Sequence, residues 1–402
     1  MEQISRRSLL FSGGATLGAL AVGSQAWTWP ASASIAGSGP GADPRWVWDD
    51  VADPLIADVI DRGDVDLVNS LIRTWTTNGQ ALPAGLPADV HDFMESARQL
   101  PTWADPAKLD ASFTFTTKRG LYLGALYGLG SGMMSTAIPH EARAVYYSKG
   151  GADMKDRISK TAKLGYDIGT QDAFAPNGSM IVTCVKTRMV HAAVRHLLPR
   201  SGFWQQTADQ QTPISQRDMM ITWHSLASFT WQKLAAWKIQ IPQAEADGFL
   251  HSWQLTAHML GIRDEYIPAS WDEAVSQSHQ VLDPVLGATP EGIELADTLL
   301  NLAASVDGGT LSYPFLAAAT RYNLGDPLCD ALQIKRNAYW DNFFKAGWPP
   351  FVAFREAGLA LPFAPAGYWM FDEFLRRGAL FYLSDGKPIS IEIPSGNNPN
   401  YS

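Results

Sequence analysis

The sequence has little cysteine and lacks the short motifs that mark the commonest enzyme and metal sites. Its two cysteines, Cys184 and Cys329, can form at most one disulfide bond, which excludes the cross-linked framework of a small secreted domain; whether they are joined stays open. No CxxCH motif is present, so a covalently attached c-type heme is excluded. CxxC, HExxH and GxSxG are also absent, which removes the commonest zinc, metalloprotease and serine-hydrolase classes.

Positive charge is scarce and scattered along the chain. Lys and Arg number 31 against 40 Asp and Glu, which gives a net charge of −9, and there is no long basic run. Proteins that bind nucleic acid or an anionic membrane surface need clustered Lys and Arg to contact phosphate groups. We therefore expect neither partner, and a neutral or apolar ligand suits this composition better.

The N-terminal segment contains no apolar run long enough to span a bilayer, because the run at 15–22 is too short. It instead combines the sequence SRRSLLF at 5–11 with a small-residue cleavage site at 31–33. We predict that residues 1–33 are a twin-arginine signal peptide and that the protein is secreted by that pathway. Since the pathway transports folded proteins, it suits a protein that acquires a cofactor before export.

The remaining chain divides by composition into an extension and a helical core. Residues 37–106 are rich in Pro, Gly and Trp, with short helical stretches at 53–62 and 65–74, so we predict that residues 34–110 wrap around the rest. We predict one helical domain over residues 111–402. Its periodicity predicts helices at 117–136, 179–200, 215–238, 244–260, 270–282, 290–304 and 311–322.

Strand patterns are nearly absent, so the predicted fold class is all-α. Only residues 389–394 alternate in the way that a single short strand would, and we expect the last six residues, NNPNYS, to fray. The predicted helix at 117–136 contains five glycines, which allow a very close approach to a neighbour. That neighbour is either a crossing helix or a flat cofactor.

The predicted helix at 179–200 is apolar on most sides but has one imidazole, that of His191, on a mixed stripe. A buried histidine needs a hydrogen-bond partner or a metal. A satisfied core histidine is the usual outcome, so the sequence leaves both interpretations open. The stripe, at helical spacing, consists of Cys184, Thr187, Arg188, His191, Val194, Arg195 and Leu198.

A second helical stretch, at 154–165, places Arg157, Lys160, Thr161 and Leu164 on one face beside an apolar face. A charged stripe is normally just solvated. Because this one borders a packing face, it also fits the edge of a cavity.

Two further ionisable residues are candidates, each with a structural alternative. Glu141 follows Pro139 and His140 at a predicted helix N-terminus, where the helix dipole alone favours an acidic residue. His224 lies beside the apolar stripe of the predicted helix at 215–238, where it is either a core residue or part of a cofactor site.

These residues together resemble the bacterial latex-clearing proteins, which are secreted rubber oxygenases within a wider family of heme-containing oxygenases. The resemblance rests on RISKT with Arg157, Lys160 and Thr161, on TRMVHAAVRH with His191, and on IPHEARAVYYSKGG with Glu141. It extends over essentially the whole chain, including the export signal and the later RYNLGDP segment. It implies an all-α fold with a globin-like core that encloses a heme, and additional N- and C-terminal helices.

The resemblance also implies one non-covalent heme b per chain. His191 would be the proximal iron ligand, while Lys160 would face the other side of the heme and serve as a possible distal ligand when no substrate is present. Arg195 and His224 complete the predicted cofactor-binding set.

The implied reaction is oxidative cleavage of cis-1,4-polyisoprene by dioxygen to oligo-isoprenoids with aldehyde and ketone ends. Glu141 would be the base that removes an allylic proton, and Lys160 and Thr161 would border the reaction site. Arg157 would pair with a heme propionate or an acidic neighbour.

Two alternatives come from other protein classes. A heme protein that only binds or senses a small gas would use His191 equally well, although the chain is longer than a carrier needs. An exported helical binding protein without a cofactor would be colourless, so an absorption spectrum in the Soret region distinguishes it. We expect a monomer, because a bulk polymer substrate gains little from a closed assembly.

Overall fold

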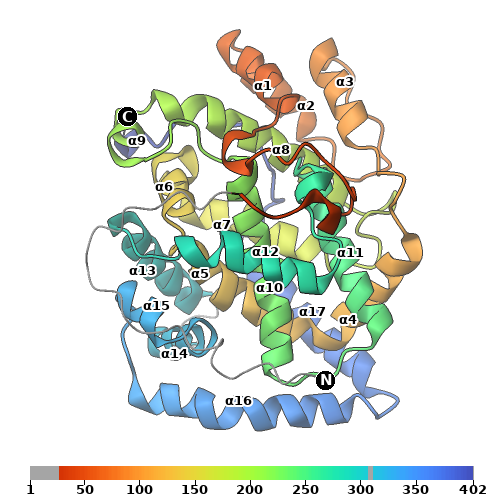
Figure 1. The fold of residues 1–402 in the computed structure, drawn as a ribbon, viewed down its shortest axis with the longest axis vertical. Coiled ribbons are helices and arrows are strands. Elements are labelled where there is room, and N and C mark those ends of the chain that lie inside the picture. The colour runs from red at the N-terminus through yellow and green to blue at the C-terminus, as the bar shows by residue number, and fades with distance from the viewer. Residues whose placement is uncertain (1–26, 307–310, 402) are drawn as a thin grey trace.

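The structure, a computed structural model, describes residues 27–306 and 311–401 (Figure 1). Within this part of the chain no β-strand is formed beyond isolated bridges, which confirms the predicted all-α class. The twin-arginine motif at 5–11 lies outside the described residues. The helices are α1 (Ala52–Asp61), α2 (Val65–Ile72), α3 (Ala88–Ala97), α4 (Pro106–Ala125), α5 (Met133–Ser135), α6 (Pro139–Tyr147), α7 (Met154–Asp167), α8 (Met180–Leu197), α9 (Gly202–Thr207), α10 (Gln216–Ala236), α11 (Gln243–Met259), α12 (Trp271–Val281), α13 (Pro290–Ser305), α14 (Tyr313–Leu324), α15 (Asp326–Ala331), α16 (Ala338–Gly358) and α17 (Ala364–Leu383).

Most predicted helices agree with the observed ones to within two residues. The predicted helix at 179–200 is α8 with a 3-10 turn at Leu198–Arg200. The predicted helix at 215–238 is α10, whose start is fixed by a capping box between Ser215 and Asp218. The apolar pattern was a sufficient signal here because both helices are buried over most of their length.

The predicted helix at 117–136 is wrong in both its boundaries and its geometry. It forms the second half of α4, then a π-helical segment at Leu126–Gly132, then α5. Gly130 lies so close to α10 that an added Cβ would be 2.5 Å from a ring carbon of Phe229. A helix crossing therefore accounts for this glycine, and the boundary predicted at residue 111 falls inside α4.

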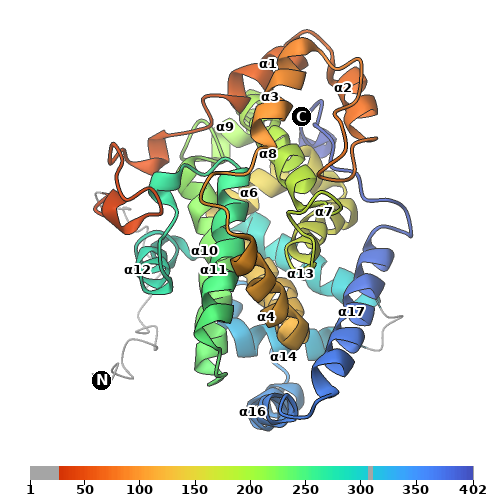
Figure 2. The same ribbon diagram turned by 90° about the vertical axis from the view of Figure 1, so that its right-hand side faces the viewer.

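The centre of the molecule is the packing of α4 against α11, beside α10 (Figure 2). A Cβ at Gly248 would lie 2.5 Å from the carbonyl oxygen of Lys108, so only glycine permits this helix separation. Phe115 and Phe249 then stack across the interface with ring centroids 4.6 Å apart. This pair anchors a core that extends to α8 and α12.

The N-terminal extension packs α1 against α8, the helix of His191 (Figure 1). The carboxylate of Asp49 accepts hydrogen bonds from Arg188 at 2.5 and 2.9 Å. Asp53 accepts one from Arg195 at 2.7 Å. The extension therefore holds α8 at two points along its length, by ion pairs to residues of the mixed stripe.

The C-terminal tail is neither a strand nor frayed over its described length, contrary to both predictions. Ile393 is 2% exposed, and its backbone exchanges two hydrogen bonds with the side chain of Asn69, at 2.8 and 2.9 Å. Asn398 donates to the backbone oxygens of Tyr146 and Tyr147 at the end of α6. Side-chain amides thus satisfy the tail backbone, which an alternation pattern does not reveal.

Candidate active site

The predicted site residues lie on four helices that meet inside the molecule. Glu141 is in the first turn of α6, Arg157 is in α7, and His191 is in α8. The fourth helix, α10, contributes Thr222, whose hydroxyl donates a hydrogen bond of 3.2 Å to Glu141 Oε2. The contacts described below show which of the predicted residues the fold brings together.

Glu141 does not cap its own helix. Residue 138, at the N-cap position, forms no side-chain cap hydrogen bond, and the Glu141 carboxylate is directed across to α10. Burial raises the pKa of Glu141 to about 7, against the opposing effects of the Arg157 charge and the Thr222 hydrogen bond. The helix-dipole interpretation is therefore insufficient, because the carboxylate is held in a poorly solvated interior position.

Arg157 connects the carboxylate with the imidazole. Its charge lowers the pKa of Glu141, and it also lowers the pKa of His191. Burial lowers the pKa of Arg157 itself, and the nearby carboxylate partly compensates. All three groups therefore lie within one region of low dielectric constant.

His191 is held neutral with an unused buried nitrogen. Its Nδ1 is buried and has no hydrogen-bond partner among the residues that the structure describes. Burial lowers the pKa of His191 to about 3, and the charges of Arg195 and Arg157 add to this effect. A neutral imidazole with a free lone pair is the state that binds iron. The residues present therefore fit a heme ligated by His191.

Lys160 and Thr161 lie on α7 but are less enclosed. The ammonium group of Lys160 binds Asp156 on the preceding turn at 2.6 Å, and its side chain is 30% exposed. Thr161 is exposed, and its hydroxyl donates to the backbone oxygen of Arg157 at 3.3 Å. In this conformation Lys160 is directed along its own helix instead of toward His191.

Arg195, which was predicted to contact the cofactor, is bound to protein groups in this structure. This guanidinium is buried, and it donates to Asp53 at 2.7 Å and to the backbone oxygen of Ile214 at 3.1 Å. These two hydrogen bonds join α8 to α1 and to the backbone that precedes α10. Arg195 acts on the site through its charge, which lowers the pKa of His191.

The structure also argues against a cofactor contact for His224. Its Nδ1 is 2.7 Å from Ser228 Oγ and its Nε2 is 2.7 Å from Gln277 Oε1, so both ring nitrogens are occupied. His224 follows Thr222 by two residues, which is about 200° around α10, so it points away from Glu141. The core-histidine interpretation is therefore the better one.

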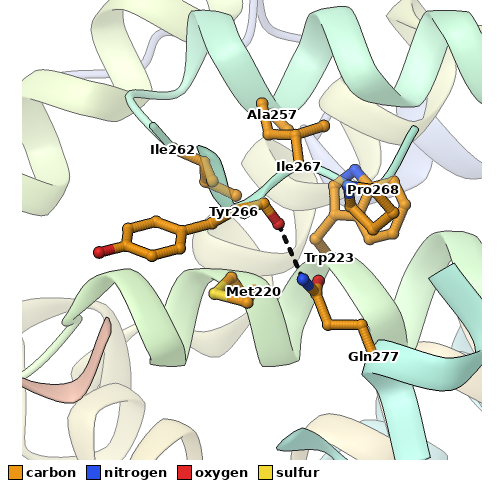
Figure 3. A pocket seen from close by; sticks show the side chains of 8 residues that line it. All are labelled: Met220, Trp223, Ala257, Ile262, Tyr266, Ile267, Pro268 and Gln277. Carbon is orange, nitrogen blue, oxygen red and sulfur yellow. Dashed lines mark hydrogen bonds between the residues drawn. The ribbon is translucent and has the colours of Figure 1, made fainter. Parts of the chain in front are cut away.

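The small hollow near His224 supports the same conclusion (Figure 3). It is lined by Trp223, Tyr266 and Gln277 among others, and has room of about 10 Å³, close to that of a single water. Gln277 donates to the backbone oxygen of Tyr266 at 3.1 Å across it. A porphyrin cannot be placed there.

Sequence reasoning missed Thr222 and the role of His140. His140 lies between the carboxylates of Asp209 at 2.6 Å and Asp218 at 3.3 Å, and so ties the start of α6 to α10. Burial alone would lower the pKa of His140, but the two carboxylates raise it to about 9. The adjacent position of His140 and Glu141 was the available signal, whereas nothing local distinguishes Thr222 from other helix threonines.

The fold and this arrangement define an all-α protein in which Glu141, Arg157 and His191 form one ionisable cluster, and comparison with known proteins identifies its family. Residues 118–351 match the family described as ER-bound oxygenase mpaB/B'/Rubber oxygenase, catalytic domain, and the chain belongs to this family. It is 54% identical over 408 residues to the rubber oxygenase of Streptomyces sp. (strain K30), with 100% of both chains covered. It also resembles the solved structure of the latex clearing protein LCP in the closed state, with 56% identity, a TM-score of 0.83, and 92% of this chain and 99% of that chain covered.

Proposed function

We propose that this protein is an exported, heme-dependent rubber oxygenase. It cleaves the double bonds of cis-1,4-polyisoprene with dioxygen and releases oligo-isoprenoids with aldehyde and ketone ends. The activity and the substrate class are supported by the rubber oxygenase to which the whole chain is similar. The observation that supports the chemistry is the raised pKa of Glu141. Burial raises this pKa to about 7, although the charge of Arg157 opposes the rise.

His191 would hold one heme b through its imidazole, without a covalent link. When bound, the heme supplies the activation of dioxygen. The low pKa of His191, about 3, keeps the imidazole unprotonated at any working pH. Two ion pairs hold α8 in place, Asp49 with Arg188 before His191 in the sequence and Asp53 with Arg195 after it.

Glu141 is the base in this proposal. A pKa of about 7 means that the carboxylate accepts an allylic proton from the substrate and releases it again near neutral pH. The Thr222 hydroxyl fixes one carboxylate oxygen at 3.2 Å, and the Arg157 charge stabilises the ionised form. Arg157 is thus assigned to the acidic-neighbour role, because a guanidinium does not give up its proton.

We propose that Lys160 and Thr161 would border the heme that His191 would hold. For Lys160 to reach an iron it would have to leave Asp156, to which it is bound at 2.6 Å. Its partly exposed, flexible side chain allows that exchange at low cost. The ion pair therefore supports a removable distal ligand and not a permanent one.

The gas-binding alternative gains no support. A site that only binds a small gas has no use for a desolvated carboxylate, which costs folding free energy when it ionises. Glu141 is such a group, and the protein to which the chain is similar is named an oxygenase.

Secretion by the twin-arginine pathway remains part of the proposal and is supported by the sequence motif at residues 5–11. No described helix is long and apolar enough to cross a membrane. We expect the secreted protein to act as a monomer.

The proposal is tested on purified full-length protein by a Soret absorption spectrum and by analysis of latex incubated with it in air. A b-type heme spectrum together with carbonyl-ended oligo-isoprenoids is the expected result. A Soret band without products would favour gas binding, and colourless protein without products would favour a binding protein without cofactor.

A further inference from the structure

Exposed apolar side chains are concentrated on the two C-terminal helices. Of the eighteen large hydrophobic residues that are the most exposed in the described chain, twelve lie between 339 and 381. We call them the outer apolar face. They are Tyr339, Phe343, Phe351, Phe354, Leu361, Phe363, Trp369, Met370, Phe371, Phe374, Leu375 and Phe381.

Four strongly exposed side chains of this face form a stripe that starts at the N-cap of α17 and continues along the helix. Phe363, Met370, Phe374 and Phe381 are exposed by 73, 66, 74 and 71%. Their spacings of seven, four and seven residues place them on one side of a helix with 3.6 residues per turn. α16 and α17 run along the periphery of the molecule (Figures 1 and 2). The stripe is therefore an outward surface, well beyond the single exposed apolar residues of an ordinary protein.

The stripe does not result from a loosely placed helix. On the inner side of α17, Asp372 is 3% exposed, forms an ion pair with Arg355, and accepts a hydrogen bond from the backbone nitrogen of Leu121 at 2.8 Å. A Cβ at Gly120 would lie 3.1 Å from the Cβ of Asp372, so α4 and α17 are closely packed. The polar inner side and the apolar outer side are consequently fixed.

The outer apolar face carries little charge. Of the eight charged residues in the range 338–383, Lys345 and Arg377 are exposed, and Arg377 is paired with Glu373 at 2.7 Å. A surface that binds anionic lipid needs clustered basic side chains, and a specific protein partner usually needs polar groups to pair with. This face instead complements a material that has neither charge nor hydrogen-bonding groups.

The face is continuous with the candidate active site through α7. Tyr166 of α7 donates to Glu373 at 2.5 Å, and its backbone oxygen accepts from Arg376 at 2.8 Å. The same helix contains Arg157, one of the three groups of the site. α17 thus packs directly on the helix that carries Arg157, with its contacts at Tyr166 nine residues further along α7.

We propose that the outer apolar face is the surface by which this protein adsorbs to solid polyisoprene. This inference rests on the proposed function, since a rubber oxygenase must reach a hydrocarbon that does not dissolve. Burial of exposed aromatic side chains against the polymer supplies the free energy of adsorption. Adsorption through α17 holds the α7 side of the site close to the polymer. Polyisoprene chains can then enter the site while the protein stays bound to the particle.

The test uses a triple variant of the heme-loaded full-length protein, Phe363→Gln with Phe374→Gln and Phe381→Gln. Glutamine is a good helix former, and the three side chains are exposed, so the fold is retained. The matched control replaces three exposed apolar residues of the N-terminal extension, as Trp46→Gln, Val51→Gln and Leu67→Gln. Co-sedimentation with washed latex particles measures adsorption, and cleavage is measured on latex and on a short cis-1,4-oligo-isoprene dispersed in detergent.

We expect the triple variant to lose at least about tenfold in latex adsorption and in latex cleavage, since each aromatic side chain removed from a hydrocarbon contact weakens binding several-fold. Cleavage of the dispersed oligomer should be unchanged, and the control should behave as wild type. Unchanged latex adsorption by the triple variant would overturn the inference. The inference would also be overturned if light scattering showed that the wild type is a dimer and that the triple variant alone is a monomer. It would equally be overturned if the triple variant lost binding to phosphatidylcholine vesicles while its latex adsorption stayed intact. Adsorption without cleavage of either substrate by the wild type would overturn the proposed function and leave the docking surface standing.

Discussion

The hydroxyl of Thr222 on α10 donates a 3.2 Å hydrogen bond to the partly buried carboxylate of Glu141 on α6. Two helices far apart in sequence thus position one oxygen, while the Arg157 charge acts on the same group. A carboxylate held in this way is suited to proton transfer, and its replacement should separate chemistry from binding.

Glu141→Gln should therefore preserve heme content and fold but reduce polyisoprene cleavage by roughly two to four orders of magnitude, the usual contribution of a positioned base. The amide is nearly isosteric, and its oxygen still accepts from Thr222. Carbonyl-ended products and the ferrous dioxygen spectrum are measured on the same sample. Glu95→Gln, which changes an exposed carboxylate, is the control. Near-normal product yield would remove Glu141 from the mechanism and leave the heme assignment intact.

The pH dependence follows from the raised pKa of Glu141, about 7. Activity should rise as pH increases through about 7, because the base must be ionised. Stability should change in the opposite direction: because the pKa of Glu141 is raised from its ordinary 4.5 to about 7 in the folded protein, its contribution to stability is complete below about 4.5 and is lost as pH rises through about 7. Thermal unfolding of the wild type and of Glu141→Gln is measured from pH 5 to 8.5. The midpoint of the variant should rise relative to that of the wild type as pH increases, and a constant difference between the two midpoints would contradict the prediction.

His140 should contribute stability with a different pH window. Its pKa is raised from 6.5 to about 9 by the carboxylates of Asp209 and Asp218, so its contribution is complete below about 6.5 and disappears as pH rises through about 9. His140→Asn should therefore lower the midpoint of thermal unfolding at pH 6 and have little effect at pH 9.5. An equal loss at both pH values would mean that packing, and not the ion pairs, is responsible.

His191→Ala should lose heme while the chain stays largely helical, because the surrounding core is apolar. Heme content by absorption and helicity by circular dichroism are the measurements. His224→Ala is the informative comparison, since it leaves Gln277 Oε1 without its partner and should lower stability without loss of heme. Full heme retention by His191→Ala would move the ligand to another histidine.

Lys160→Ala should keep heme and change the spectrum of iron coordination, since Lys160 is proposed as the distal ligand. Asp156→Asn should change it in the opposite direction, because loss of the 2.6 Å ion pair releases the ammonium group toward the heme. Identical spectra for both variants and the wild type would make Lys160 a solvated surface charge.

The sequence pattern predicted most of the core helices, and α8, which is apolar and buried on most of its sides, is the clearest case. No helix was predicted at α17, whose outward side is as apolar as many buried ones, so its pattern does not show which side faces the core. The tail around Ile393 alternates like a strand yet binds the Asn69 side chain, a contact between residues that are distant in sequence.

The same limit applies to the site. The resemblance identified Glu141, Arg157 and His191, and the fold brings these three into one region of low dielectric constant. Arg195 and His224 were predicted from helical position alone, and their actual partners, Asp53 and Gln277, lie on other helices. Periodicity gives the side of a helix, whereas only the packed structure gives the neighbour.

The ion pairs between α1 and α8 also decide how small a working fragment can be. A protein trimmed to the family segment 118–351 would keep Arg188 and Arg195 but lose Asp49 and Asp53. Arg195 is 4% exposed, and a buried charge stripped of its partner costs about 3–5 kcal/mol, a large part of the stability of a typical domain. The autonomous folding unit of this oxygenase is therefore longer than its catalytic segment, and it begins before Asp49.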